Sequence, residues 1–175
     1  MSVQDTLEQV INYEVYVEGG RCLGTASVEL PELQYMTQTI KGAGVAGELD
    51  APTLGHLQSL EMKLTFRALF DKPVELMQQR LATNLSCRGA LQRYDPTLGL
   101  TKVVRVQVDF RGRPKGINLG KLEPGELTDT EITFECDIIS VKIDGKEILL
   151  HDKLNFISRV NGDDQLLDVR MALGF

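Results

Sequence analysis

Three segments of the chain alternate strictly between apolar and polar residues, the pattern of a β-strand with one buried and one solvated face. From Ser59 to Phe66, apolar residues occupy the even positions. The same alternation runs from Val103 to Arg111 and from Glu131 to Ile138. The predicted buried rows are Leu60, Met62, Leu64 and Phe66; Val104, Val106, Val108 and Phe110; and Ile132, Phe134, Cys136 and Ile138. So much amphipathic sheet, with no reactive group beside it, favours a protein that builds a surface over one that runs a reaction.

The third of these segments continues into a shift of pattern. Its apolar residues occupy even positions as far as Ile138 and odd positions from Ile139 to Ile143. A slip by one residue would bury charged side chains unless a bulge or bend intervenes. The sequence therefore predicts one strand that bends and serves two sheets.

Turn signals divide the remainder into shorter strands. Glu18-Gly19-Gly20-Arg21 and Asp144-Gly145 predict hairpin turns, because glycine accepts the positive φ that such turns require. Tyr94-Asp95-Pro96-Thr97 predicts another turn. The additional predicted strands are Asn12–Val17, Cys22–Leu30, Leu33–Ile40, Leu85–Arg93 and Lys146–Leu150, and the strand of the first alternating segment is predicted to begin at Leu57.

A first short helix is predicted after the strand that ends at Phe66. Asp71 is placed to cap its free amides, and Pro73 is tolerated in a first turn. The helix is expected to run to about Leu81, with Val74, Met77 and Leu81 spaced for burial on one face.

A second short helix is predicted near the C-terminus. Asn161-Gly162 makes a turn, and Asp163 or Asp164 is expected to cap a helix that runs through Met171. Gly174 is then the expected end of the helix, because glycine readily adopts the left-handed conformation found there.

Two polar, glycine-rich stretches resist regular structure. Lys41–Pro52 is too long for a simple hairpin connection, and Gly112–Asp129 carries four glycines and two prolines. With strands dominating and no βαβ alternation, the predicted fold is a mainly β, antiparallel sandwich or barrel with one or two short helices. It is expected to form a single domain over residues 1–175.

Composition excludes several classes of protein. With 42% hydrophobic and 25% charged residues, a chain of 175 residues can bury an ordinary core. A net charge of −6, without a basic run, argues against binding nucleic acid through phosphate contacts. The first residues lack the layout of a secretory signal, so we expect folding in a cytoplasm and no membrane partner.

No constellation for catalysis or metal binding stands out, and no cofactor is expected. Cys22, Cys87 and Cys136 have an odd count and no metal-ligand spacing, so they are expected to be free thiols. Cys136 lies in a buried row, whereas Cys22 is near a turn and could be exposed. His56 and His151 are interpreted as surface or loop histidines. The chain is therefore not expected to be an enzyme.

Several short patterns, in order and at matching separations from about residue 12 to the end, resemble the major tail tube protein of contractile-tailed bacteriophages and R-type bacteriocins. They are Leu30-Pro31-Glu32-Leu33, Lys41-Gly42-Ala43-Gly44, Arg111-Gly112-Arg113-Pro114-Lys115, Lys142-Ile143-Asp144-Gly145-Lys146-Glu147, Val160-Asn161-Gly162-Asp163-Asp164 and Leu173-Gly174-Phe175. The resemblance implies hexameric rings stacked into a tube inside a sheath, with strands from every subunit closing a continuous β-barrel around the lumen. It also implies sheath, baseplate and tail terminator proteins as partners, with the tape measure protein and then genomic DNA in the lumen, the DNA without specific binding.

Under this resemblance the polar rows become candidates for the lumen wall. They are Ser59, Glu61, Lys63, Thr65, Arg105, Gln107, Asp109, Glu131, Thr133, Glu135 and Asp137. With Arg111 included, these rows carry five acids and three bases, and a mildly acidic wall suits a DNA conduit because it does not hold phosphate. The two polar stretches become candidates for contacts between stacked rings, through Lys41, Gly42, Gly44, Gly47, Asp50, Arg113, Lys115 and Glu123.

Other functions remain open from the sequence. The related Hcp-like tube of a type VI secretion or bacteriocin injection machine shares the implied fold and assembly. A monomeric β-sandwich that binds a carbohydrate or peptide would need an exposed aromatic platform, and the chain has no Trp and only 6% aromatic residues.

Overall fold

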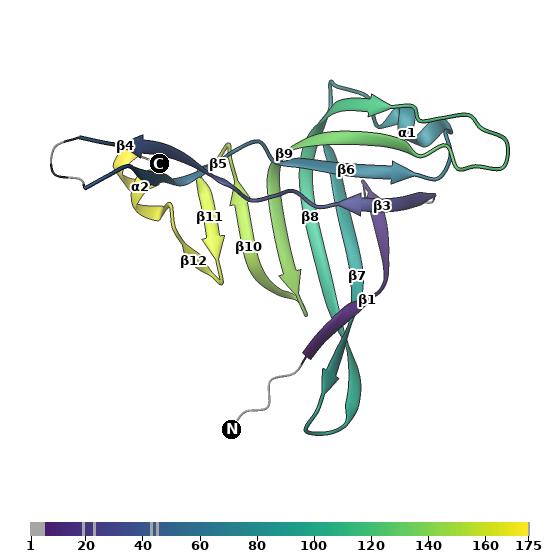
Figure 1. Ribbon diagram of the computed structural model, residues 1–175, viewed down its shortest axis with the longest axis horizontal. Coiled ribbons are helices and arrows are strands. Elements are labelled where there is room, and N and C mark those ends of the chain that lie inside the picture. The colour runs from purple at the N-terminus through teal and green to yellow at the C-terminus, as the bar shows by residue number, and fades with distance from the viewer. Residues whose placement is uncertain (1–5, 19, 23, 43, 45, 175) are drawn as a thin grey trace.

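The computed structural model describes residues 6–18, 20–22, 24–42, 44 and 46–174, which are mainly antiparallel β-structure (Figure 1). The strands are β1 (Thr6–Val17), β2 (Gly20–Cys22), β3 (Thr25–Glu29), β4 (Tyr35–Ile40), β5 (Leu49–Leu57), β6 (Glu61–Phe66), β7 (Thr83–Asp95), β8 (Leu100–Asn118), β9 (Thr130–Ile143), β10 (Lys146–Asp152), β11 (Ile157–Val160) and β12 (Asp163–Asp164). The helices are α1 (Asp71–Glu75) and α2 (Leu167–Leu173). The predicted fold class is confirmed.

One sheet contains ten of the strands, and its main path runs β12-β11-β10-β9-β8-β7-β1-β2. On the side of β9 away from β8, its first half pairs with β6 and its second half with β10. β3 pairs with β6, and both strands run across the upper ends of β7 and β8, with β6 alongside the first half of β9 (Figure 1). The bent sheet thus encloses the core on two sides but does not close into a barrel within one chain.

The bend in β9 lies where the sequence pattern shifts. Arg111 of β8 pairs with Ile138 and the adjacent Gly112 pairs with Cys136, so Asp137 is the extra residue of a bulge. A Cβ atom on Gly112 would lie 2.5 Å from the carbonyl oxygen of Glu135, so the close approach requires glycine. The predicted bend is confirmed, although both halves belong to one continuous sheet.

The apolar rows of β6 and β9 pack into the core as predicted, except for Ile138, which follows the bulge and is only half-buried. Met62 pairs with Phe134 and Leu64 with Ile132, and all four side chains are 0% exposed. Val104, Val108 and Phe110 are also buried, while Val106 is half-buried at the margin of the core. Burial of these side chains supplies the main hydrophobic stabilisation of the fold.

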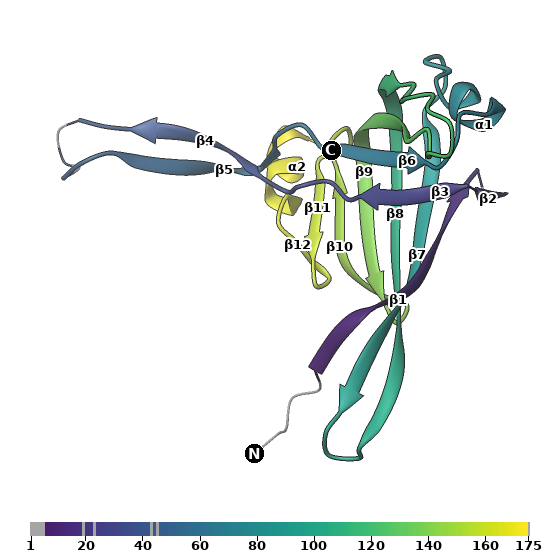
Figure 2. The ribbon, with the colours of Figure 1, turned by 45° about the vertical axis from the view of Figure 1, so that its right-hand side comes forward.

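The predicted loop 41–52 is wrong at its C-terminal end, because residues 49–52 belong to β5. Ile40 pairs with Leu49 and Thr37 with Pro52, so β4 and β5 form a separate two-stranded sheet. This hairpin, residues 35–57, projects from the rest of the molecule in both views (Figures 1 and 2), and we call it the arm. The predicted strand 57–66 breaks at residues 58–60, where the chain leaves the arm to pair with β9.

The predicted loop 112–129 is also shorter than expected, because β8 continues to Asn118. Pro114 cannot donate a backbone hydrogen bond, and the register shifts between Pro114 and Gly116. The β-structure therefore accommodates this proline at an irregularity instead of ending there.

The first hairpin differs from the prediction in its return strand. β1 begins at Thr6 and pairs with β2 only over Val15–Val17. The chain then turns at Gly24, with φ of 86°, and β3 joins β6 instead. The expected strand 22–30 is thus two strands with different partners.

The first helix has a different buried face from the predicted one. It has no side-chain cap, so the capping role of Asp71 is wrong, and α1 ends at Glu75. Pro73 and Leu76 are buried, whereas Val74 and Leu81 are largely exposed.

The last helix also begins without a side-chain cap, at Leu166. Asp164 instead forms an ion pair with Arg170 at 2.7 Å. Gly174 ends the helix with φ of 84°, as predicted.

Candidate functional site

The predicted polar rows lie on the side of β6, β8 and β9 that is away from the core. Glu135 of β9 pairs with Glu61 of β6 on one side and with Arg113 of β8 on the other. The outward-facing residues of the three strands are therefore neighbours. We call this surface the polar face. Its members are Ser59, Glu61, Lys63, Thr65, Arg105, Gln107, Asp109, Arg111, Arg113, Lys115, Glu131, Thr133, Glu135, Asp137 and Lys142. The bend in β9 divides it into an upper part on β6 and a lower part around Asp109.

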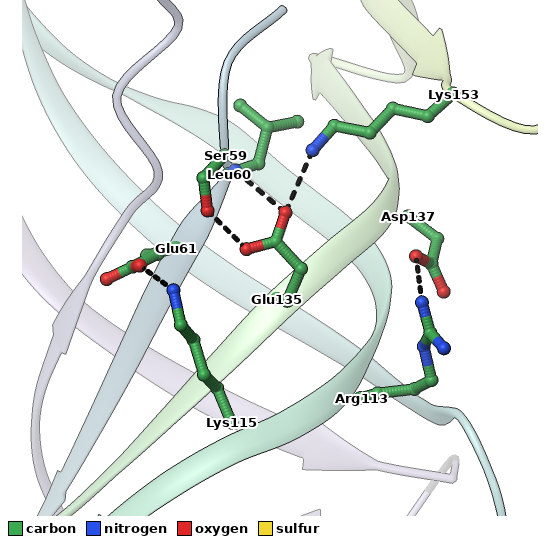
Figure 3. Close-up of polar contacts among 8 residues, drawn as sticks. All are labelled: Ser59, Leu60, Glu61, Arg113, Lys115, Glu135, Asp137 and Lys153. Carbon is green, nitrogen blue, oxygen red and sulfur yellow. Dashed lines mark hydrogen bonds and ion pairs between the residues drawn. The ribbon is translucent and has the colours of Figure 1, made fainter.

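Glu135 is the centre of the upper part (Figure 3). Its carboxylate accepts hydrogen bonds from the Ser59 hydroxyl at 2.5 Å, the Leu60 amide at 3.2 Å and the Lys153 ammonium at 3.0 Å. Burial alone would raise the pKa of Glu135, but these donors outweigh it and hold the pKa below its ordinary value. Glu135 therefore fastens the segment before β6 and the end of β10 to β9.

Other acids of the upper part are also paired with bases. Glu61 accepts a hydrogen bond from Lys115, and Asp137 from Arg113 at 3.3 Å (Figure 3). The ion pair with Glu61 raises the pKa of Lys115. These contacts place Arg113 and Lys115 beside the predicted wall residues, on β8 instead of in a loop.

The lower part is organised around Asp109. Its carboxylate accepts hydrogen bonds from Ser86 at 2.6 Å, Gln107 at 2.8 Å and Lys142 at 3.1 Å. Burial opposes ionisation, yet these donors lower the pKa of Asp109. Nearby on the same side of the sheet, the Arg88 guanidinium lies 4.3 Å from the centre of the Tyr16 ring.

The ion pairs change the predicted charge of the polar face. Each of the five acids counted from the sequence has a base within 4.0 Å; the pairs are Glu61 with Lys115, Asp109 with Lys142, Glu131 with Lys63, Glu135 with Lys153 and Asp137 with Arg113. Of these five bases, only Lys63 belongs to the polar rows predicted from the sequence. The expected excess of acid on this face is therefore wrong, and the acids are neutralised locally.

The residues predicted to connect stacked rings lie in three separate places. Lys41, Gly42, Gly44 and Gly47 are in the turn of the arm, and Asp50 is in β5 beside them. Arg113 and Lys115 belong to the polar face, and Glu123 is exposed in the loop 119–129. The basic residues at alternate positions, Arg111, Arg113 and Lys115, could have indicated that β8 continues.

The arm has one apolar and one polar face. Ile40 pairs with Leu49 and Gln38 with Ala51, so these residues share a face, and alternation along β4 adds Met36 to it. On the other face, the Thr39 hydroxyl donates a hydrogen bond to Asp50 at 2.7 Å. Met36, Ile40 and Leu49 are each about half exposed, so the apolar face is uncovered in the single chain.

The thiols and histidines do not form a reactive site. All three cysteines are buried, which corrects the expectation for Cys22, and burial raises the pKa of Cys87 and Cys136 to about 12. His56 is exposed on β5, whereas His151 is buried, contrary to its interpretation as a surface residue, and burial lowers its pKa. Within the described ranges no cluster of residues suits a metal ion, and no helix there is long and apolar enough to cross a bilayer.

Comparison with known proteins gives matches along nearly the whole chain. A model of the phage tail tube protein FII family matches residues 7–174. The tail tube protein of Escherichia phage P2 is 30% identical over 164 residues, or 91% of this chain and 93% of that protein.

Solved structures of an extracellular contractile injection system, PVC, are also similar. Its sheath/tube terminator in the extended state matches with a TM-score of 0.54 and 16% identity, covering 81% of this chain and 99% of the terminator. Its sheath-tube complex in the extended state matches with a TM-score of 0.49 and 16% identity, covering 74% of this chain and 87% of that chain. The match to the terminator shows a common fold.

Proposed function

Because the chain belongs to the phage tail tube protein FII family, it is a structural, non-enzymatic tail tube protein of a contractile, phage-like injection system, and we propose that its copies form hexameric rings that stack into the inner tube. The observation that carries this proposal is the family match over residues 7–174. The open sheet supports it. Residues 9–12 of β1 pair with β7 on one edge and with no other strand among the described residues on the second edge, and such edges favour pairing with another copy.

The polar face is the proposed lumen wall, with strands of neighbouring copies closing a continuous barrel. Four of its six bases, Lys63, Arg113, Lys115 and Lys142, are already paired with carboxylates, and such a base has less to gain from a phosphate. Genomic DNA would then pass without specific binding. The turn of the arm and the loop around Glu123 are the proposed contacts between stacked rings.

The remaining partners follow from this role. We propose that the tube carries the sheath on its outside, joins the baseplate and the terminator at its ends, and holds the tape measure protein in its lumen during assembly. The protein would be assembled in the cytoplasm of the bacterial host and remain in the tail of the particle.

Electron microscopy of the purified chain tests the proposal. We expect rings of six copies, and tubes at higher protein concentration. Monodisperse single copies at every concentration, with the fold intact by circular dichroism, would contradict it.

A further inference from the structure

An apolar groove lies on the core side of β1, β7 and β8. It has a volume of about 310 Å³, and Val10, Tyr13, Leu30, Leu91 and Val106 line it. Val108 and Cys87, at its floor, also belong to the core, so the groove is an extension of the core that is open to solvent. Val10 is 57% exposed there, although its side chain is apolar. A surface of this kind marks a place where another apolar element binds.

The arm is an apolar element of suitable size within the same chain. A strand of six residues such as β4 is about 20 Å long, enough to cross three strands spaced about 5 Å apart. Its face contains the apolar residues Met36, Ile40, Leu49 and Ala51, with Gln38 as the polar member, and Met36, Ile40 and Leu49 are about half exposed. The charged pair Lys41 with Glu48 lies in the turn, beyond this face, and can remain in water while the face is buried.

The placement of arm and groove decides between self-docking and docking onto another copy. In both views the arm extends away from the body, whereas β1 lies on the other side of the molecule (Figures 1 and 2). An arm on one side and its receptor on the other make a head-to-tail contact. Such a contact joins copies into closed rings or helical filaments, whereas a self-complementary patch gives only a pair.

We propose that the apolar face of the arm docks into the groove between β1, β7 and β8 of the next copy of the chain. This inference rests on the proposed function, because it names the surface through which tube subunits hold one another. Docking covers an apolar surface on each partner and extends the core of one copy across the boundary to the next.

Cross-linking between separately prepared variants tests the docking. One preparation carries Ile40→Cys and the other Val10→Cys; they are mixed, allowed to form tubes and treated with a short bis-maleimide. The native thiols are buried and Cys87 and Cys136 have raised pKa values, so they react slowly. We expect covalent dimers only in the mixture. The matched control pairs Val10→Cys with Thr37→Cys, on the opposite face of the arm, and should give at least fivefold less dimer.

A second measurement uses charge. Ile40→Asp should raise the protein concentration needed for tube formation at least tenfold, and Thr37→Asp less than threefold. Tubes of wild-type protein with no cross-link above the control would overturn the docking but leave the proposed function standing. A cross-link within single copies of the double variant, at dilutions without assembly, would show that the arm folds onto its own groove and would also overturn it. Wild-type protein that never assembles would overturn the proposed function itself.

Discussion

The arm and the β6–β9 core use the same alternation of apolar and polar residues with opposite results. In the core, Met62 and Phe134 are fully buried against other strands of the chain. In the arm, every residue of β4 is exposed. The core buries its apolar row within one copy, whereas the arm leaves its apolar row for a second copy. Alternation in sequence therefore identifies a two-sided strand but not the chain that will cover it.

The largest expected difference between the two regions is in stability. Phe134→Ala removes a fully buried ring from the core and should lower the free energy of unfolding by about 3–5 kcal/mol. Ile40→Ala, in the arm, should lower it by less than about 0.5 kcal/mol, because the side chain is already half exposed. Urea unfolding of the unassembled protein measures both. Equal losses would show that the arm is packed in the single copy.

The next effect concerns the polar face. Glu135→Gln removes the charge that three donors share and should cost about 1–2 kcal/mol, because Lys153 loses its counter-charge and the new amide nitrogen cannot accept a hydrogen bond. Glu131→Gln is the matched control, since its contact with Lys63 is 4.0 Å long and should contribute less than about 0.5 kcal/mol. An equal loss of unfolding free energy in both variants would show that the contacts of Glu135 stabilise the fold no more than the contact of Glu131 does.

The same carboxylate predicts a pH dependence. The pKa of Glu135 is lowered in the folded state. Its contribution to the free energy of unfolding is therefore fully present above the ordinary pKa of 4.5 and is lost as the pH falls through the folded-state pKa. Wild-type protein should therefore lose more stability than Glu135→Gln in acid solution below that value. Parallel losses in the two proteins would contradict this assignment.

The sequence could predict the faces of the strands but not their partners. Leu60 to Phe66 alternate locally, and local alternation sets which side chains are buried. Pairing depends on contacts between distant residues, such as the hydrogen bond from the Cys136 amide to the Leu60 carbonyl at 2.8 Å, which alternation does not encode. Alternation does not predict the bases Arg113 and Lys115 of the polar face for a similar reason. They flank Pro114 and follow Gly112, and these two residue types indicate a loop in the sequence. The turns at Asp144-Gly145 and Asn161-Gly162 were predictable, because their positive φ angles are a local requirement.

An effect of about the same size is expected where the arm joins the body. Gly55 has φ of 69°, and a Cβ atom there would lie 2.4 Å from a methyl carbon of Leu166. Gly55→Ala should cost about 1–2 kcal/mol through backbone strain and displacement of Leu166. Gly116→Ala, where nothing lies within 4 Å, should cost less. Thermal unfolding of the two variants measures the difference, and equal midpoints would mean that the base of the arm is not fixed by this contact.

The smallest effect is expected at the turn of the arm. Lys41 and Glu48 form an ion pair at 2.9 Å, but both side chains are about two-thirds exposed. Lys41→Gln should change the free energy of unfolding by less than about 0.5 kcal/mol, with little dependence on salt. A larger loss in urea unfolding would place this pair in a more buried setting than the single copy provides.

Hydrogen exchange of assembled and unassembled protein is the most direct test that the core is completed within one copy and the arm by another. The backbone amides of β6 and β9 should be equally protected in both states, because their partners lie in the same chain. The amides of residues 36–52, in the outer part of the arm, should exchange rapidly in single copies and become protected in tubes. Equal protection of the arm in both states would contradict the account.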